Sequence, residues 1–341
     1  MGVKLSSITT PRTISLGDLS GKIIAIDAYN MLYQFLATIR GPDGTALSTS
    51  RGAVSSHLVG LFARTTSMLE KGIKPLYVFD GAPPQMKRAE RERRQALKRD
   101  ARDAYERAVQ DEDVEAMKKY ASRLSRLTPE MVADAKELLE GLGVPWLDAP
   151  SEGEAQAAAL VREGTAWASA SEDYDSLLFA SPRHVRQLTI SGKRRKSGKI
   201  GTYTVEPELI ELEPLLTDTG LSQRQLIIVG ILIGTDFNPG GIRGIGPKKA
   251  LKLVEEHEDP ETLFQAVGYD EQFETPWQEI LEFFEHPPLA QDVSFTFTEP
   301  DEDALRTLLV GRFEFSEQRV SDGAAKSRTR PKNQTGLGSF I

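Results

Sequence analysis

Seven acidic residues of this 341-residue chain stand where apolar runs of the sequence end, at five separate places: Asp27, Asp80, Glu152, Glu154, Asp173, Asp175 and Asp236. The runs before them read as buried strands or a buried helix. Because neighbouring parallel strands end at one crevice, we expect the acids to gather in a single site. Two carboxylates ~4 Å apart repel by about 4 kcal/mol at an effective dielectric near 20. Cations must therefore lie between them.

The residue types that the chain lacks narrow the choice of cation. It has no cysteine and only four scattered histidines. This composition excludes disulfides, cysteine nucleophiles and thiolate zinc sites, and argues against histidine-based metal sites and triads. A metal would be held by oxygen alone, and such sites favour Mg²⁺, Mn²⁺ or Ca²⁺. Two divalent ions about 4 Å apart can bind many carboxylates and clamp both reacting oxygens of a phosphodiester.

Basic residues that follow Asp80 supply the positive charge that such a site needs. Seven carboxylates around two divalent ions leave an excess of three negative charges, which would repel a phosphate. Lys87 and Arg94 lie seven residues apart, two turns along one helix face. The run from Lys87 to Arg102 holds eight basic and three acidic residues, although the whole chain has a net charge of −8. A solvated face is the alternative, but charge of one sign favours a phosphate-binding patch.

Each acid also has a structural interpretation. Asp27 and Asp80 could be helix caps or turn residues. The sequence Ser151-Glu-Gly-Glu154 fits a capping box, in which the last glutamate bonds back to the backbone of the cap. The sequence Asp173-Tyr-Asp175 could be a solvated turn. The conjunction of five such places with chemistry restricted to oxygen ligands favours a functional site.

The elements that would position these acids alternate as in an α/β protein. Residues 1–80 show strand and helix patterns at βαβ spacing, with helices expected at 28–39 and 52–71. Further along the chain, we expect the segments 185–190 and 200–205 to pair as a hairpin. The pattern predicts a sheet flanked by helices.

The segment 84–127 is charged and favours helices throughout. Its second half has an apolar face at helical spacing, whereas its first half has almost none. A helix that is polar all round is exposed, weakly ordered, or ordered by a ligand.

A glycine-rich turn opens a helix near residue 247. Backbone N–H groups at such a helix start bind phosphate readily, and lysines follow them. A plain tight connection is the alternative. Two flanking helices favour a helix-hairpin-helix that grips a DNA backbone without reading its bases. The residues concerned are Gly244, Gly246, Lys248, Lys249 and Lys252.

We expect no targeting or membrane segment, and the end of the chain carries little that would pack into a core. The start lacks the pattern of a signal peptide, and no apolar run approaches the ~20 residues of a membrane span. From about Ser321 the chain is rich in Lys, Arg, Ser and Gly, so we expect this tail to be flexible. Its last eight residues nevertheless restore apolar groups, which is typical of a docking peptide.

Six ordered motifs resemble those of the flap endonucleases, the structure-specific 5′ nucleases of the XPG group, in an archaeal-like form. They are Ile26-Asp-Ala-Tyr-Asn30, Tyr77-Val-Phe-Asp-Gly-Ala-Pro-Pro-Gln-Met-Lys87, Ala149-Pro-Ser-Glu-Gly-Glu-Ala155, Ser171-Glu-Asp-Tyr-Asp-Ser176, Gly234-Thr-Asp236 and Gly241-Ile-Arg-Gly-Ile-Gly-Pro-Lys-Lys-Ala250. The resemblance spans essentially the whole chain. It implies an α/β fold with a mixed, largely parallel sheet flanked by helices, a PIN-like nuclease core, a helical arch and a DNA-binding helix-hairpin-helix.

The resemblance also implies a role for each acid. The acids would hold two Mg²⁺ ions, which Mn²⁺ can replace. Asp27, Asp80 and Glu154 would lie toward one ion and Asp173 and Asp175 toward the other, with Glu152 and Asp236 acting through water.

Other residues would contact DNA or a partner protein. Lys87 and Arg94 would steady the scissile phosphate, and Tyr33 would stack on the base beside it. Arg40 would lie near the bound DNA. The tail residues that resemble the family's sliding-clamp peptide are Gln334, Leu337, Phe340 and Ile341. Ile341 stands where a second aromatic is usual, which predicts weaker clamp binding.

The implied activity is 5′-flap cleavage with 5′–3′ exonuclease activity, which leaves a ligatable nick in Okazaki fragment maturation and base excision repair. The alternatives are a related exonuclease or Holliday-junction resolvase, or a non-catalytic tether between DNA and the clamp. We expect a cytoplasmic, nucleoid-associated monomer. Its expected regions are an N-terminal nuclease region (1–98), an arch (99–115), an internal nuclease region with the hairpin (116–257), C-terminal core helices (258–325) and a tail (326–341) that carries the clamp peptide (333–341).

Overall fold

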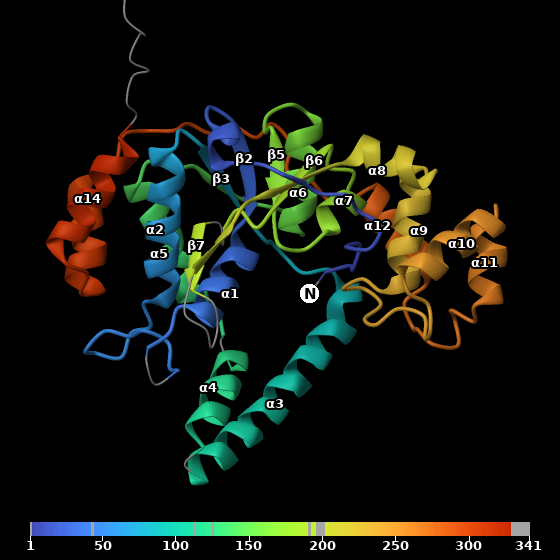
Figure 1. Ribbon diagram of the computed structural model, residues 1–341, viewed down its shortest axis with the longest axis horizontal. Coiled ribbons are helices and arrows are strands. Elements are labelled where there is room, and N and C mark those ends of the chain that lie inside the picture. Colours follow the sequence, from blue (N-terminus) through green and yellow to red (C-terminus); the bar gives the residue numbers. More distant parts are fainter. Residues whose placement is uncertain are drawn as a thin grey trace, which may run out of the picture.

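The centre of the computed structural model is a seven-stranded sheet with the order β1-β9-β6-β5-β2-β3-β4 (Figure 1). The structure describes residues 2–41, 44–111, 113–124, 126–189, 192–195 and 202–328. Five neighbouring strands run parallel: β6 (Arg183–Arg186), β5 (Ala168–Ala170), β2 (Ile23–Asp27), β3 (Lys74–Phe79) and β4 (Trp146–Asp148). At one edge, β9 (Glu208–Glu211) and β1 (Arg12–Thr13) pair antiparallel. The sheet is mixed and largely parallel, as the sequence predicted.

Alternate residues of the central strands point into two separate cores. Ile24 and Ile26 of β2 face one core, and Ala25 between them faces the other. The first core is covered by four helices: α1 (Ala28–Thr38), α2 (Ser56–Glu70), α5 (Pro129–Gly141) and α14 (Glu317–Ser327). The second is covered by α6 (Gly153–Arg162). Because both faces are buried, β2 and β3 read as almost unbroken apolar runs.

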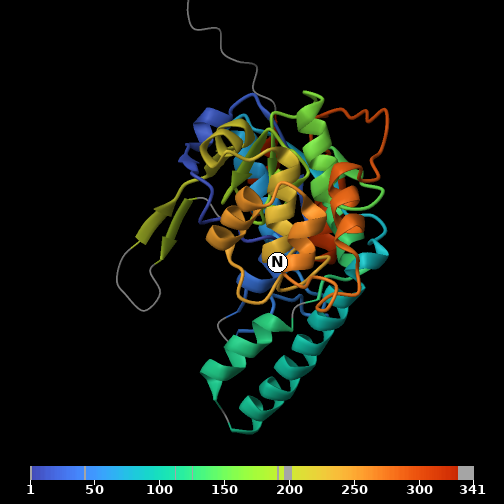
Figure 2. The same cartoon turned by 90° about the vertical axis from the view of Figure 1, so that its right-hand side faces the viewer.

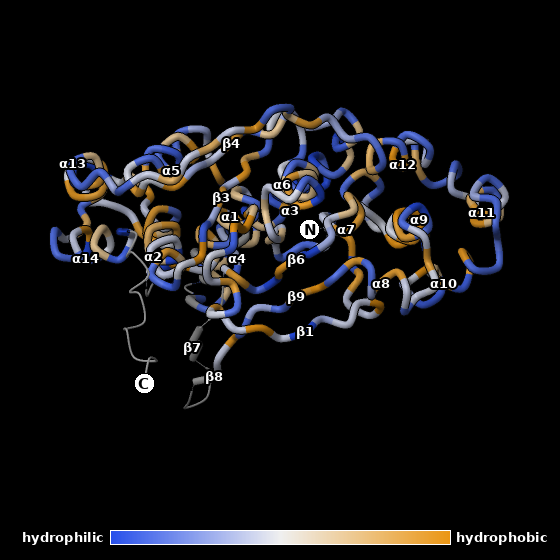
Figure 3. Tube along the Cα trace, turned by 90° about the horizontal axis from the view of Figure 1, so that it is seen from above, coloured by the Kyte–Doolittle hydropathy of each residue, from blue (hydrophilic) through white to orange (hydrophobic). Residues whose placement is uncertain are grey.

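A second group of helices lies at the end of the molecule opposite α14 (Figure 1). Its members are α7 (Asp175–Leu178), α8 (Leu212–Thr219), α9 (Gln223–Ile233), α10 (Pro247–Glu256), α11 (Pro260–Ala266) and α12 (Trp277–Glu285). Helix α9 of this group is largely hydrophobic, as its orange colour in Figure 3 shows. Between α9 and α10, Gly240, Gly241 and Gly244 adopt positive φ angles that side chains rarely adopt. The predicted pair of helices around a glycine turn is therefore present. Two short elements, α13 (Glu302–Leu305) and the π-helix η3 (Arg306–Arg312), lead to α14.

A helical hairpin projects from the body of the molecule (Figures 1 and 2). The short helix η2 (Gln85–Lys87) leads into α3 (Arg88–Gln110), which packs against α4 (Val114–Arg123). Ala101 and Ala108 of α3 are buried. These small side chains, two turns apart, allow close approach of the two helices, whereas the rest of α3 is mostly solvated. The prediction of helices across 84–127 is confirmed.

Three local expectations were wrong. The helix expected at 52–71 begins at Ser56, because isolated bridges pair Arg40 with Ala46 and Ser48 with Val54. In the described parts of these segments, 185–189 and 202–205, the two do not pair with each other. Instead β6 joins the central sheet, and β8 (Thr202–Val205) pairs with β7 (Gly192–Arg195). The chain expected to be flexible from about Ser321 instead continues as α14 to Ser327, because Val320 and Ala324 pack into the first core. The residues from 329 onward, with the clamp peptide, lie outside the described residues. Within the described ranges, no helix combines the length and apolar character that a bilayer crossing requires.

Helices α1 and α2 pack closely at Gly60, which gives a test of how α1 is held. A β-carbon added at Gly60 would lie 2.2 Å from the ring of Phe35 on α1. Gly60→Ala should therefore lower the free energy of unfolding by about 1–3 kcal/mol through overpacking, even though alanine favours helices. Urea denaturation measures the effect. Gly311→Ala, whose β-carbon would come no closer than 3.9 Å to a neighbour, is the control. Equal stabilities of the two variants would contradict the packing argument.

Candidate active site

One cleft of about 750 Å³ contains all seven acids that the sequence singled out. It lies between the carboxyl ends of the central strands and the base of the α3–α4 hairpin. Its lining residues are Asp27, Tyr29, Asn30, Tyr33, Ala37, Asp80, Lys87, Glu90, Arg93, Arg94, Leu97, Lys98, Glu152, Glu154, Asp173, Asp175 and Asp236. The structure thus brings Lys87, Arg94 and Tyr33 to the same place as the acids.

The sheet order explains why the acids meet. Strands β5, β2, β3 and β4 are adjacent and parallel, so their carboxyl ends lie side by side. The acids leave these four ends in turn: Asp173 and Asp175 after β5, Asp27 at the end of β2, Asp80 after β3, and Glu152 and Glu154 after β4. Only Asp236 comes from elsewhere, from the turn after α9.

Amide N–H groups hold several of these carboxylates in place. The backbone N–H of Asn30 donates to Asp27 (3.0 Å), and the side-chain amide of Asn30 donates to Asp173 (3.0 Å). Gly153 N–H donates to Asp80 (2.7 Å), and Val3 N–H donates to Asp175 (2.7 Å). Asp27 is therefore both a helix cap and a member of the cleft, and the two interpretations from the sequence are compatible.

The capping-box interpretation of Glu154 is wrong. Helix α6 begins at Gly153 with Glu152 at the N-cap position, one residue later than Ser151, and no side chain caps it. The side chain of Glu152 accepts a hydrogen bond from Lys87 Nζ (2.5 Å). One oxygen of Glu154 is buried without a hydrogen-bond partner. Such an orphaned oxygen is costly unless something positive approaches it.

Two cations from the base of the hairpin reach into the acidic cluster. Lys87 Nζ lies 2.5 Å from Glu152 Oε2 and 3.3 Å from Asp236 Oδ2. Arg94 Nη2 donates to the same Asp236 oxygen at 2.9 Å. Asp236 therefore joins both cations that the sequence proposed as phosphate contacts.

Glu90 is a part of the cleft that the sequence reasoning missed. Its carboxylate accepts hydrogen bonds from Arg93 Nε and Arg94 Nε, both at 2.7 Å. The spacing of Glu90 from these arginines, three and four residues along a helix, was the available signal. Tyr33 and Leu97, at 40% and 51% exposure, are the exposed large hydrophobic side chains of the described chain, and both line this cleft.

Burial and mutual repulsion raise the pKa values of most of the acids. Burial is the main cause for Asp27 and Glu154, whose pKa values lie well above the ordinary range. The charges of Asp80 and Asp175, respectively, add to that effect. Burial, followed by repulsion from Asp236 and Asp173, raises the pKa of Asp175 to about 7. These three carboxylates are thus harder to ionise, first because they are buried and then because charged neighbours repel them.

Lys87 and Arg94 reverse this effect locally. Burial alone would lower the pKa of Lys87, but Glu152 and Asp236 more than offset it, so the pKa is raised. Burial alone would raise the pKa of Asp236, but Lys87 and Arg94 lower it below its ordinary value. Lys87 and Arg94 therefore carry full positive charge at neutral pH, and Asp236 is ionised.

The donor set fits a hard divalent cation. It consists of carboxylate oxygens, one of them orphaned, and Mg²⁺ or Mn²⁺ prefers such ligands. Among the described residues, no three of the seven acids bring their oxygens within 4.8 Å of one another.

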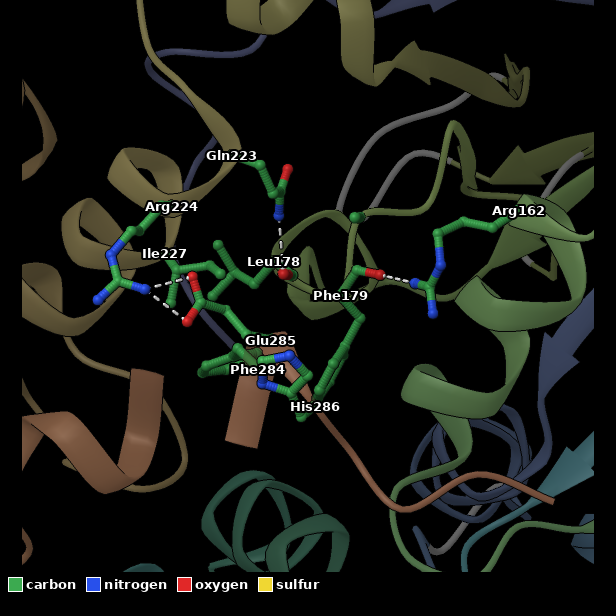
Figure 4. Close-up of a pocket in the computed structure, with 10 residues that line it drawn as sticks. Arg162, Leu178, Phe179, Gln223, Arg224, Ile227, Phe284, Glu285 and His286 are labelled. Carbon is green, nitrogen blue, oxygen red and sulfur yellow. Dashed lines mark hydrogen bonds and ion pairs between the residues drawn. The ribbon is translucent and has the colours of Figure 1, made fainter. Parts of the chain in front are cut away.

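A second cavity of about 460 Å³ lies near α6, α7, α9 and α12 and contains none of the seven acids (Figure 4). Nearby, Glu282, Glu285 and His286 have ligand atoms within 4.8 Å of one another. Figure 4 shows Arg224 bound to both oxygens of Glu285, each at 2.7 Å. Because this guanidinium competes with any ion, we assign no metal site there.

The remaining expected DNA contacts lie outside the cleft. Arg40 donates to the carbonyls of Ala37, Leu36 and Gly44, so it closes the end of α1, and its DNA contact stays a prediction. The positions around the helix-hairpin-helix turn are exposed: Gly244, Gly246, Lys248, Lys249 and Lys252. A β-carbon at Gly244 or Gly246 would meet nothing within 4 Å, so the backbone there is open to a ligand. Lys252 pairs with Glu256 at 3.3 Å in solvent. The clamp-peptide residues are not among those described.

Removing one acid should stabilise the metal-free protein. Asp175→Asn keeps the oxygen that accepts Val3 N–H but removes the repelled charge, so in EDTA its melting temperature should rise at pH 8. Folding raises the pKa of Asp175 from 3.8 to about 7. The free energy of unfolding of the wild-type protein is therefore highest below pH 3.8, where Asp175 is neutral in both states. It falls as the pH rises toward 7, because the unfolded chain ionises first. The gain should be about 4 kcal/mol above pH 7, at roughly 1.4 kcal/mol for each unit of the pKa shift, and should shrink toward pH 4.

The exposed acid Asp218 on α8 provides the control, since Asp218→Asn should leave the melting temperature unchanged. Thermal melts in EDTA between pH 4 and pH 8 measure both variants. A lower or unchanged melting temperature for Asp175→Asn at pH 8 would contradict close packing of the acids.

Comparisons with known proteins show the family of this chain. Residues 1–101 match the XPG N-terminal domain, and residues 143–236 match the XPG I-region. Flap endonuclease 1 of Aeropyrum pernix is 50% identical over 323 residues, covering 94% of this chain and 92% of that protein. The Pyrococcus furiosus protein of that name is 46% identical over 333 residues, covering 98% and 96%. The solved flap endonuclease-1 of Methanococcus jannaschii has a TM-score of 0.75 and 37% identity, covering 96% and 98%. The chain belongs to the flap endonuclease family of XPG nucleases.

Proposed function

We propose that this protein cleaves DNA near the junction of a 5′ flap, with associated 5′–3′ exonuclease activity, and leaves a ligatable nick. The observation that carries the proposal is the single cleft in which seven acids meet Lys87 and Arg94 at the base of the projecting hairpin. Membership of the flap endonuclease family adds the substrate class. Such a product suits Okazaki fragment maturation and base excision repair.

The acids would hold Mg²⁺, or Mn²⁺ in its place, as two ions. Asp27, Asp80 and Glu154 would lie toward one ion and Asp173 and Asp175 toward the other, with Glu152 and Asp236 acting through water. When bound, divalent ions lower the pKa of water and neutralise charge on a transferring phosphate. Asn30 keeps the Asp173 carboxylate oriented through its 3.0 Å hydrogen bond.

Lys87 and Arg94 would bind the scissile phosphate. Their partners, Glu152 and Asp236, are acids of the cluster itself. Once other cations neutralise those acids, the ammonium and guanidinium groups can turn to phosphate oxygens. Charge that develops on the phosphate in the transition state would then be stabilised by donors already in place.

The rest of the surface suits a branched substrate. Tyr33 offers an exposed ring at the cleft on which an unpaired base would stack, and Leu97 offers an apolar side chain across from α1. The α3–α4 hairpin would surround the free 5′ strand. Lys248 and Lys249, beside the open glycine turn, would hold duplex phosphates.

The C-terminal peptide would tether the protein to a sliding clamp. Leu337 and Phe340 would anchor in the clamp, with Gln334 alongside. Ile341 replaces the second aromatic anchor, so the affinity should be lower than with an aromatic residue at that position.

Loss of a phosphate contact or a metal ligand should abolish most cleavage. Lys87→Ala and Asp175→Ala should each slow Mg²⁺-dependent cutting of a labelled 5′-flap DNA by about 10²-fold or more. The control is Lys74→Ala, because Lys74 lies at the opposite end of β3 from Asp80 and should not affect the rate. If Lys87→Ala and Asp175→Ala cut at the wild-type rate, the mechanism is wrong.

A panel of substrates separates the alternatives. With a double-flap DNA, the wild-type protein should cut near the junction in Mg²⁺ and should only bind DNA in EDTA. Rates on a four-way junction and on a blunt duplex should be lower, because only the flap supplies a free 5′ strand for the hairpin. Faster junction or duplex cutting would identify a resolvase or an exonuclease. DNA retention without any scission in Mg²⁺ would identify a tether.

A further inference from the structure

The carboxylate of Glu90 is buried in a helix that is otherwise largely solvated. Glu90 is 2% exposed and stands in the first turn of α3. Its Oε2 accepts from Arg93 Nε at 2.7 Å, and its Oε1 accepts from Arg94 Nε at 2.7 Å and Arg93 Nη2 at 3.1 Å. Three charged N–H donors therefore bind this carboxylate, and such bonds offset the cost of burying its charge.

Arg94 is held from two sides. The guanidinium is a planar fork, with one N–H on its Nε edge and four at its Nη end. Glu90 occupies the Nε edge, while Asp236 accepts from Nη2 at 2.9 Å. Since these bonds anchor the two edges to different elements, the plane of the fork is fixed and its Nη end faces the acidic cleft.

The neighbouring ion pair on the same helix lacks this environment. Glu92 accepts from Arg88 Nε at 2.9 Å, but their side chains are 62% and 80% exposed. Such exposed pairs contribute little. Lys87, the other proposed phosphate contact, has partners in the cleft and none from its own helix. Burial and position together therefore distinguish Glu90 from ordinary charges of the hairpin.

We propose that Glu90 is a positioning residue for flap cleavage, which keeps the Nη end of Arg94 aimed at the scissile phosphate. The proposal rests on the proposed function of the cleft. The negative charge of Glu90 beside Arg94 weakens the attraction of the cleft for DNA, so removing this charge should not weaken DNA binding. Loss of Glu90 should therefore slow cleavage without weakening DNA binding, whereas a merely structural loss would impair both.

Glu90→Gln tests the proposal, since it keeps the shape and one acceptor but removes the charge. DNA affinity is measured in Ca²⁺ by fluorescence anisotropy, and the cleavage rate in Mg²⁺ under single turnover with saturating enzyme. The rate should fall about 10-fold or more, as expected when a contact group is misaligned. The dissociation constant should stay the same or fall. In an Arg94→Ala background, Glu90→Gln should produce no further loss of rate.

Two companion variants make the result decisive. Glu92→Gln removes an equivalent charge from the same helix outside the cleft and should change neither rate nor affinity. Glu90→Asp keeps the charge but withdraws the carboxylate from Arg94, so its rate should stay low even if Glu90→Gln proves unstable in a thermal melt. A wild-type rate for either Glu90 variant, or a loss that adds fully to Arg94→Ala, would overturn the proposal. If the wild-type protein itself fails to cut flaps, the proposed function is at fault instead.

Discussion

Repulsion among seven carboxylates is the constraint on which the rest of this structure depends. Four adjacent parallel strands deliver six of them to one edge, and the end of α9 delivers Asp236. Burial then raises the pKa values of Asp27 and Glu154 far above the ordinary range. Buried, unpaired carboxylates would strongly destabilise the fold unless hydrogen-bond donors or cations offset their charge. The surrounding elements can be understood as the source of that compensation.

Three kinds of positive or hydrogen-bond-donating group offset the repulsion among the carboxylates. Backbone N–H groups of Asn30, Gly153 and Val3 fix individual acids. Lys87 and Arg94 enter from the base of the hairpin and meet at Asp236. Divalent cations would supply the remainder. Because the two basic residues belong to the projecting hairpin, the charge requirement of the cleft also couples that hairpin to the nuclease core.

Simple rules predicted much of this arrangement from the sequence. The apolar runs of β2 and β3 identified buried parallel strands, and the rule for parallel sheets then brought their terminal acids together. The seven-residue spacing placed Lys87, at the end of η2, and Arg94, in α3, on one side of the hairpin base. The pairing of 185–190 with 200–205 was wrong, because β6 buries Val185 in the central sheet, and hairpin patterns do not reveal such long-range partners. The capping box at Ser151 failed because α6 begins one residue later, with Glu152 at the N-cap, and Glu154 is buried among the other acids of the cleft.

The sequence by itself determined which residues could do chemistry, because ligand type, charge and strand ends depend on local composition. It also determined that Asp80 and its basic partners belong together, since they are close in the chain. Only the tertiary structure decided that Arg94 meets Asp236 across 142 residues and that Glu90 is buried beneath two arginines. It also decided that Arg40 closes α1. Contacts of that kind depend on burial and on the approach of distant elements, and neither is written in local spacing.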